Sequence, residues 1–161
     1  MELGAPYIAV VGAGIAEEGD ARVAEAVGRL LAASGAVLVC GGLGGVMEAA
    51  CRGAKAAGGT TVGILPGRRR SDANRYVDVA ITTGLGEMRN PLVVRAADVV
   101  IAISGEFGTL SEMAFALKIG VPVVGIGTWE LARRGRSVEA FHTAASPEEA
   151  VEAARRLWSS Q

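Results

Sequence analysis

The sequence has few aromatic residues, few cysteines and no excess charge of either sign. Only 4% of its 161 residues are aromatic but 50% are hydrophobic, so aliphatic side chains must fill the core. The net charge of −1 gives no general electrostatic reason to bind nucleic acid or an anionic membrane. Twenty-three glycines are too many for a helical bundle but suit many strand-to-helix turns. At this length, one domain over residues 1–161 is the simplest expectation.

Long apolar runs and signs of a secretory signal are also missing. The longest hydrophobic candidate is interrupted by Arg95 and Asp98, short of the roughly 18 residues that a membrane span needs. The amino terminus lacks the basic region of a secretory signal. Cys40 and Cys51 fit buried free thiols in a reducing cytoplasm, and neither is spaced from His142, the only histidine, as a zinc site requires. We expect a cytoplasmic protein without a metal site.

Apolar runs of strand type alternate with helical patterns along the chain. Most of these runs are continuously apolar, as expected for strands buried on both faces. This pattern predicts an α/β fold with a doubly wound, mostly parallel sheet of about six to seven strands and helices on both faces. Ligands of such folds lie at the carboxyl ends of the strands. The expected strands are 7–11, 36–40, 60–65, 77–82, 98–103, 121–126 and 138–143; the helices follow Asp20, then 46–57, 90–97, 109–119 and 146–158, with a turn or short helix at 129–135.

Gly12-Ala-Gly14 after the first strand fits a dinucleotide site only in part. Glu17 stands where the third glycine of G-x-G-x-x-G is needed. Cys40-Gly41 stands at the end of the second strand, where an acidic residue would bind a ribose. The pattern favours a tight turn over an NAD site, with Gly12 and Gly14 as candidates for ligand contact.

The second strand ends in Gly41-Gly42-Leu-Gly44-Gly45, four glycines in five positions. Such a loop lets the backbone approach a ligand closely, and the helix that follows supplies affinity for anions. Close packing of helix against strand is the alternative explanation. The loop is no Walker A motif, because no Gly-Lys-Ser/Thr follows. We take the four glycines as candidates for phosphate or nucleotide contact.

Residues 98–112 repeat this design with an apolar strand, a glycine-bearing turn at 104–108 and a helix start. Backbone N–H groups and the positive end of the helix then point at one place, which receives phosphates and other anions. Gly105, Gly108 and Thr109 are therefore candidate phosphate-binding residues.

Glu112 and the arginines each allow two interpretations. Thr109 and Glu112 fit the T-x-x-E pattern of a capping box, so the spacing leaves Glu112 open to capping or to catalysis. Arg89 precedes a helix and either grips a phosphate bidentately or is a solvated surface residue. The basic cluster of residues 68–70 with Arg75 reaches a ligand phosphate or forms a solvated or subunit-contacting loop. No aromatic residue lies between these arginines, which disfavours nucleic-acid binding.

Three segments together carry a family resemblance: Gly41-Gly-x-Gly-Gly-Val-Met47, Met88-Arg89-Asn90 and Gly108-Thr-Leu-Ser-Glu112. In order and spacing they resemble the LOG (LONELY GUY) superfamily, much of it once labelled "lysine decarboxylase-like", and within it the molybdenum-cofactor carrier branch. The similarity runs from the first strand to about Gly127. The resemblance implies a Rossmann-like nucleotide-binding fold and a homo-oligomer, either a dimer or a tetramer.

The enzymatic branch implies a phosphoribohydrolase that releases the base of a nucleoside 5′-monophosphate, with catalytic roles on Glu112 and Arg89. A carboxylate there would stabilise the oxocarbenium charge on the ribose. Two departures favour the carrier-like branch. Ser104-Gly105-Glu106 replaces the family's Pro-Gly-Gly, and Arg89-Asn90 replaces its Arg-Lys.

We therefore expect a protein that holds a phosphorylated, nucleotide-like small molecule at residues 41–45 and 105–109. Its ligand would be a nucleotide, a molybdopterin-type molecule, or a phosphate or other oxyanion. Hydrolysis of a nucleoside monophosphate is the alternative, and an oligomeric scaffold is a third possibility. Lysine decarboxylation is disfavoured because it needs a Schiff-base lysine, and Lys55 and Lys118 both fall in predicted helix bodies.

Overall fold

The computed structural model describes residues 4–161 and is built on a seven-stranded sheet in which each neighbouring pair is parallel. The strand order is β4-β3-β2-β1-β5-β6-β9. The chain starts at β1, steps outward to β4, then crosses to β5 and steps outward again. The order therefore reverses between β1 and β5, which is where such sheets open a crevice. The strands are β1 (Tyr7–Gly12), β2 (Val37–Cys40), β3 (Thr60–Leu65), β4 (Val79–Thr82), β5 (Val99–Ile103), β6 (Val123–Ile126) and β9 (His142–Ala144).

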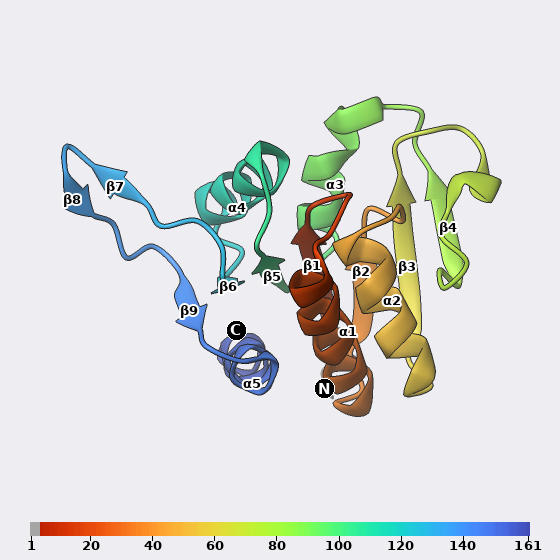
Figure 1. Cartoon of the computed structure of the whole chain (residues 1–161), viewed down its shortest axis with the longest axis horizontal. Helices are drawn as coiled ribbons and strands as arrows, with labels where there is room; N and C mark the ends of the chain where they lie inside the picture. Colours follow the sequence, from red (N-terminus) through yellow and green to blue (C-terminus); the bar gives the residue numbers. More distant parts are fainter. Residues whose placement is uncertain (1–3) are drawn as a thin grey trace.

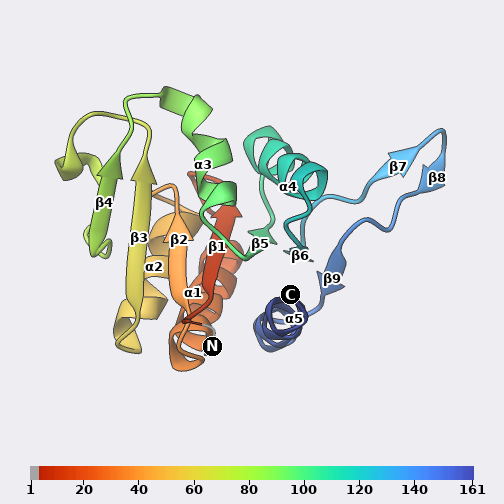
Figure 2. The ribbon, with the colours of Figure 1, turned by 180° about the vertical axis from the view of Figure 1, so that it is seen from behind.

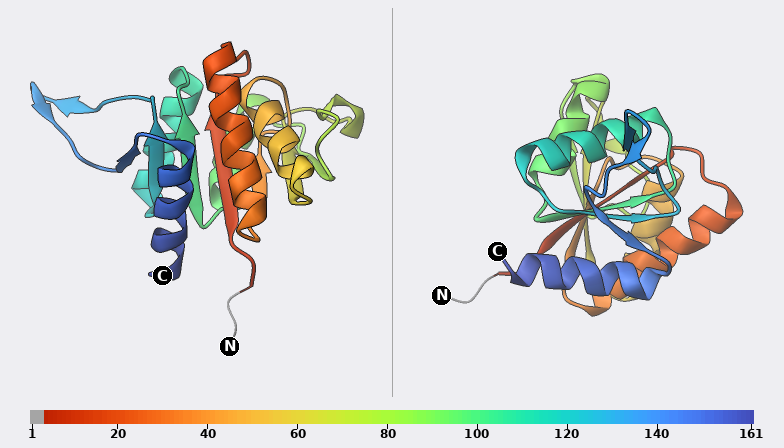
Figure 3. Two further views of the ribbon diagram at one scale, coloured as in Figure 1. Left: turned by 60° about the horizontal axis from the view of Figure 1, so that its bottom comes forward. Right: turned by 90° about the vertical axis from the view of Figure 1, so that its left-hand side faces the viewer.

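Helices cover both faces of the sheet, as Figures 1 and 3 show. Helices α1 (Glu18–Ala33), α2 (Val46–Ala56) and α5 (Pro147–Ser159) lie on one face, and α3 (Asn90–Arg95) and α4 (Phe107–Ile119) on the other. Two 3₁₀ turns, Arg70–Asp72 and Gly86–Arg89, complete the helical elements. All five residues of β5 are buried, as a strand between two helical layers requires. The α/β fold expected from the alternation and the Rossmann-like fold implied by the resemblance are both confirmed.

Three local predictions need correction. Helix α1 begins at Glu18 with Glu17 as its N-cap residue, so Asp20 lies in the first turn and does not cap the helix. The last strand is His142–Ala144 rather than 138–143. Of the turn or short helix expected at 129–135, the turn is present at 134–135 and the helix is absent, because β7 (Ala132–Arg133) and β8 (Arg136–Ser137) make a hairpin that projects from the body of the molecule (Figure 1). Its turn places Arg134 and the next glycine at positive φ, which no helix permits.

Ser146 caps α5 as expected, but the return bond of the capping box goes to Ala145, the residue before the N-cap, instead of to Ser146. The Ser146 hydroxyl accepts the Glu149 N–H at 3.1 Å, and the Glu149 carboxylate accepts the Ala145 N–H at 2.9 Å. Pro147 occupies the first turn.

Part of the sheet has no helix over it. Figure 2 shows β2, β3 and β4 with nothing in front of them on the face that carries α3 and α4. Strand alternation and register place Tyr7, Val79 and Ile81 on this face, at 47%, 48% and 47% exposure. We call these three residues the open sheet face. Among residues 4–161, no helix is both long and apolar enough to cross a membrane.

Candidate functional site

A pocket of about 380 Å³ opens at the carboxyl edge of the sheet, beside the point where the strand order reverses. Its volume falls in the range of ligand sites, which is roughly 300–1,000 Å³. The ends of β1 and β2 and the first turn of α4 contribute to its walls. The lining residues are Val10, Val11, Gly12, Ala13, Gly14, Ile15, Gly41, Met47, Arg89, Asn90, Glu106, Gly108, Thr109 and Glu112.

Most of the residues singled out in the sequence meet in this pocket. Those that line it are Gly12, Gly14, Gly41, Arg89, Gly108, Thr109 and Glu112. The other candidates, Gly42, Gly44, Gly45 and Gly105, do not line it. Gly45 instead packs its backbone against the Gly12–Gly14 turn, and the Val46 N–H donates to Ala13 O at 3.0 Å. The two glycine turns thus hold each other in place, and this contact is part of what shapes the pocket.

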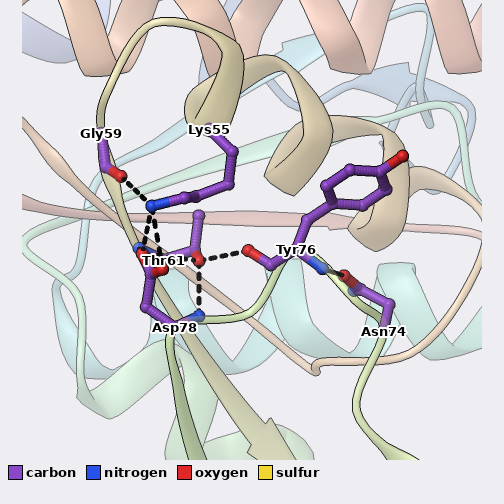
Figure 4. A network of polar contacts seen from close by, with 6 residues as sticks. All are labelled: Lys55, Gly59, Thr61, Asn74, Tyr76 and Asp78. Carbon is purple, nitrogen blue, oxygen red and sulfur yellow. Dashed lines mark hydrogen bonds and ion pairs between the residues drawn. The ribbon is translucent and has the colours of Figure 1, made fainter.

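Asn74 holds the glycine loop from the opposite side. Its backbone N–H donates to Gly42 O at 2.8 Å, and its side-chain Nδ2 donates to Leu43 O at 2.9 Å. Its Oδ1 accepts the Tyr76 N–H at 3.0 Å (Figure 4). The loop between β3 and β4 therefore fixes the glycine loop next to the pocket.

The polar network in Figure 4 anchors the end of that same loop. Asp78 accepts the Thr61 N–H at 3.0 Å and lies 2.8 Å from the Lys55 ammonium. Burial opposes the charge of Asp78, but Lys55 and Thr61 together hold the pKa of this carboxyl below its usual value. The Thr61 hydroxyl also donates to Tyr76 O at 2.6 Å. The network joins α2, β3 and the loop before β4, and none of its residues lines the pocket, so its role is structural.

The first turn of α4 has no side-chain cap. The helix starts at Phe107 with Glu106 as its N-cap residue, and the first intrahelical bond runs from Leu110 N–H to Glu106 O at 3.0 Å. Of the two alternatives left open for Glu112, the capping box with Thr109 is therefore wrong, because Thr109 lies inside the helix. Within residues 4–161, the N–H groups of 107–109 and the Thr109 hydroxyl have no hydrogen-bond partner. This helix end can accept an anion from the pocket.

Arg89 forms a fixed cation in the pocket wall. It is only 8% exposed, its Nε donates to Ile64 O at 2.8 Å, and one Nη donates to Gly41 O at 3.2 Å. Its other Nη donates to the Asn90 side chain. Burial lowers the pKa of Arg89 from its ordinary value, and Glu112 opposes the shift. A guanidinium has five N–H donors, so two remain for a ligand.

Glu112 lies half-buried in the same pocket. Burial raises the pKa of Glu112 to about 7, and the nearby charge of Arg89 only partly opposes this shift. No ion pair within 4.0 Å joins Glu112 to Arg89 or to another cation in the described part of the chain. The site thus combines a permanent cation with a carboxyl group that titrates near neutral pH.

Other predicted features lie outside the pocket. Residues 68–70 are exposed and do not line it, and Arg69 pairs with Asp72 at 3.0 Å. His142 lies on β9, 4.0 Å from Glu149. Cys40 and Cys51 are buried free thiols as expected, with Sγ atoms 3.5 Å apart. The structure shows no cluster of three metal-ligating side chains over residues 4–161.

Sequence reasoning did not assign a contact to every lining residue. Ile15 lines the pocket although it is 93% exposed, and Met47 lines it from the first turn of α2. Neither residue type carries a chemical signature, so only its position after a strand-end glycine turn could have indicated a role. Asn90 and Glu106, noted as departures from a family pattern, also line the pocket.

Comparisons with known proteins agree with this architecture. The family model described as the SLOG cluster4 family matches residues 5–151. An uncharacterized protein of Archaeoglobus fulgidus is 42% identical over 144 residues, covering 89% of this chain and 91% of the relative.

Two solved structures resemble the whole chain. The molybdenum cofactor binding protein of Rippkaea orientalis is 38% identical, with a TM-score of 0.86 over 97% of this chain and 99% of that protein. The Moco carrier protein of Chlamydomonas reinhardtii is 35% identical, with a TM-score of 0.84 over 98% of this chain and 99% of that one.

Proposed function

The chain belongs to the SLOG cluster4 family, and from this premise we propose that it binds a phosphorylated, nucleotide-like small molecule in its pocket. A molybdopterin-type ligand is the first candidate, because two similar structures are described as a molybdenum cofactor binding protein and a Moco carrier protein. The LOG superfamily relationship stays a prediction from the motifs.

One observation carries the proposal: the uncapped first turn of α4 faces the same pocket as the buried Arg89. Gly108 and Thr109 offer N–H groups and a hydroxyl, and Arg89 keeps two unused donors. Together these groups supply charge-assisted hydrogen bonds of the kind that hold phosphate. The residues present therefore suit a ligand phosphate, with Gly12, Gly14 and Gly41 allowing close approach of the backbone.

The second candidate is a phosphoribohydrolase acting on a nucleoside 5′-monophosphate. It is favoured by Glu112, a carboxyl group with a pKa of about 7 beside Arg89 in the pocket. In its ionised form Glu112 would stabilise positive charge on a ribose as the glycosidic bond breaks. Glu106 and Asn90 weigh against this activity, because they stand where the enzymatic branch has the last glycine of Pro-Gly-Gly and the lysine of Arg-Lys.

Thermal unfolding and product analysis on a panel of nucleoside 5′-monophosphates and pterin phosphates separate these candidates. We expect a phosphorylated ligand to raise the melting temperature by several degrees, since saturation at a hundred times Kd adds about 2.7 kcal/mol. We expect no free base or ribose 5-phosphate by chromatography. Base release that disappears in Glu112→Gln would overturn pure binding in favour of the hydrolase.

Thr109→Val tests the phosphate subsite itself. The change keeps the shape of a buried side chain, 3% exposed, and removes its hydroxyl. The affinity for the phosphorylated ligand should fall roughly tenfold, as expected for one lost hydrogen bond. Thr143→Val, on the exposed part of β9, is the matched control and should bind as the wild type does. Equal affinity in all three proteins would place the phosphate elsewhere.

A further inference from the structure

Glu106 is a pocket residue whose carboxylate has no partner. Its backbone is fixed, because Glu106 O accepts the Leu110 N–H at 3.0 Å and the Trp129 Nε1–H at 3.3 Å. Its side chain is exposed, does not cap α4, and makes no hydrogen bond or ion pair with residues 4–161. The pocket wall thus carries a carboxylate that no group in the described part of the chain engages, on a backbone that is fixed.

The charges around the pocket limit what can meet Glu106. Arg89 donates to Gly41 O and Ile64 O, and no ion pair within 4.0 Å joins it to this carboxylate in the described part of the chain. A phosphate at the α4 helix end would be repelled by Glu106 unless the carboxylate is engaged by hydrogen-bond donors. A ligand that carries both a phosphate and an N–H-rich edge satisfies both groups at once.

One exposed apolar side chain lines the same pocket as Glu106, and another follows Glu106 in the chain. Ile15 lines the pocket and is 93% exposed, and Phe107, next to Glu106, is 77% exposed with its ring 5.5 Å from that of Trp129. Apolar surface in the same pocket as an unpaired carboxylate suits the face and one edge of a planar heterocycle.

Building on the function proposed above, we propose that Glu106 is a specificity-determining residue that recognises a 2-amino-4-oxo heterocycle, the ring pattern of guanine and pterins. The amino group and the adjacent ring N–H of such a ring point the same way and match the two oxygens of a carboxylate, giving a bidentate, charge-assisted pair. Adenine presents an acceptor next to its amino group, and hypoxanthine lacks the amino group. A site that makes these two hydrogen bonds binds more weakly any ring that leaves the Glu106 carboxylate without donors.

Guanosine and inosine 5′-monophosphates test this inference, because they differ only in the 2-amino group. Calorimetric titration of the full chain should show roughly 10- to 100-fold tighter binding of the guanine nucleotide, as a charged hydrogen bond predicts. Glu106→Gln should lose this preference while still binding both nucleotides. Ile15→Ala should weaken both to the same extent, because a contact with the ring face does not sense the amino group. Glu130→Gln, an exposed change on the hairpin arm, should behave as the wild type.

The outcomes separate the two levels of the proposal. Equal affinity of the wild type for both nucleotides, or a preference that survives in Glu106→Gln, overturns the role of Glu106 and leaves phosphate binding intact. Failure of both nucleotides and of a pterin monophosphate to bind contradicts the proposed function, and the inference falls with it.

Discussion

At the scale of single residues, the ionisable side chains of Arg89 and Glu112 lie in the pocket, and of these two only Arg89 has hydrogen-bond partners among residues 4–161. Arg89 is buried yet keeps its charge through bonds to the carbonyls that end β2 and β3. Glu112 has no such partner, so burial shifts its protonation toward neutral pH. Ionisation of such a buried carboxyl group lowers the free energy of unfolding, so the stability of the protein reports on the protonation of Glu112.

The raised pKa of Glu112 predicts a pH dependence of stability. The folded protein binds this proton up to about pH 7, whereas the unfolded chain releases it near the usual value of 4.5. The free energy of unfolding should therefore fall as pH rises between these values, by up to about 3 kcal/mol. Glu112→Gln lacks this loss, so its melting temperature should exceed that of the wild type above about pH 7 and match it near pH 4.5.

Thermal unfolding of both proteins across this pH range is the measurement. Glu130→Gln serves as the control, because that exposed side chain should change stability equally little at all pH values. A difference between Glu112→Gln and the wild type that is constant with pH would show that Glu112 ionises normally in the folded protein.

These residues could be found from the sequence, but their states could not. Thr109, Glu112 and Arg89 follow strand ends in a recognisable pattern, and the carboxyl ends of parallel strands meet at one edge. The pKa of Glu112 and the bonds of Arg89 depend on groups far away in the chain, such as Ile64 O. No local spacing encodes them, which is why a capping box and a catalytic carboxylate looked alike before the start of α4 was known.

At the scale of elements, the glycine loop is set by contacts between turns. Gly45 has a φ of +64°, and a Cβ on it would lie 2.2 Å from Ala13 O. Both the backbone conformation and the space therefore demand glycine. Because this loop also receives the bonds from Asn74, a change at Gly45 should reach the pocket through Gly41 and Gly14.

Gly45→Ala should cost about 3 kcal/mol or more of stability and weaken ligand binding, since strain and overpacking add. Gly35→Ala is the matched control: its φ is +81°, but a Cβ there meets nothing within 4 Å. Gly35→Ala should lower the free energy of unfolding by only about 1–2 kcal/mol, because alanine is strained in the left-handed conformation. Denaturant unfolding measures both. Equal losses would mean that the Ala13–Gly45 contact does not constrain the loop.

Helices and strands were predicted well where the apolar pattern extends over many residues, and poorly where the element has only a few residues. Helices α1, α2 and α5 and the buried strands have clear patterns, so their existence is confirmed within a few residues. The hairpin of β7 and β8 has two residues in each strand, too few for any period to show. The start of α4 was placed two residues late, at Thr109 instead of Phe107, because its N-cap residue is Glu106 and not a usual capping residue.

At the scale of the whole molecule, the sheet is covered unevenly. The alternation of strands with helices along the chain predicts a parallel sheet that is buried on both faces. In β4, however, the side chains of Val79 and Ile81 are about half exposed, at 48% and 47%. Only the assembled register shows that Tyr7 shares their side of the sheet, so the sequence pattern could not locate this surface.

We propose that a second copy of the chain covers the open sheet face, in line with the homo-oligomer that the family resemblance implies. The open sheet face has helices on its other side only, so its apolar side chains are in contact with water. Burying them against a second copy stabilises the assembly by about 25 cal/mol per Å² of apolar surface. Light scattering should then give a mass that is a multiple of 16.4 kDa.

Ile81→Lys should reduce that mass to one chain, because an unpaired charge buried in an apolar interface costs several kcal/mol. It should leave the single chain folded, since the Ile81 side chain is already 47% exposed there. Leu85→Lys, at a site of similar exposure (51%) outside the open sheet face, should keep the assembled mass. An assembly that survives Ile81→Lys but breaks with Leu85→Lys would place the interface at the loop that follows β4 instead of the open sheet face.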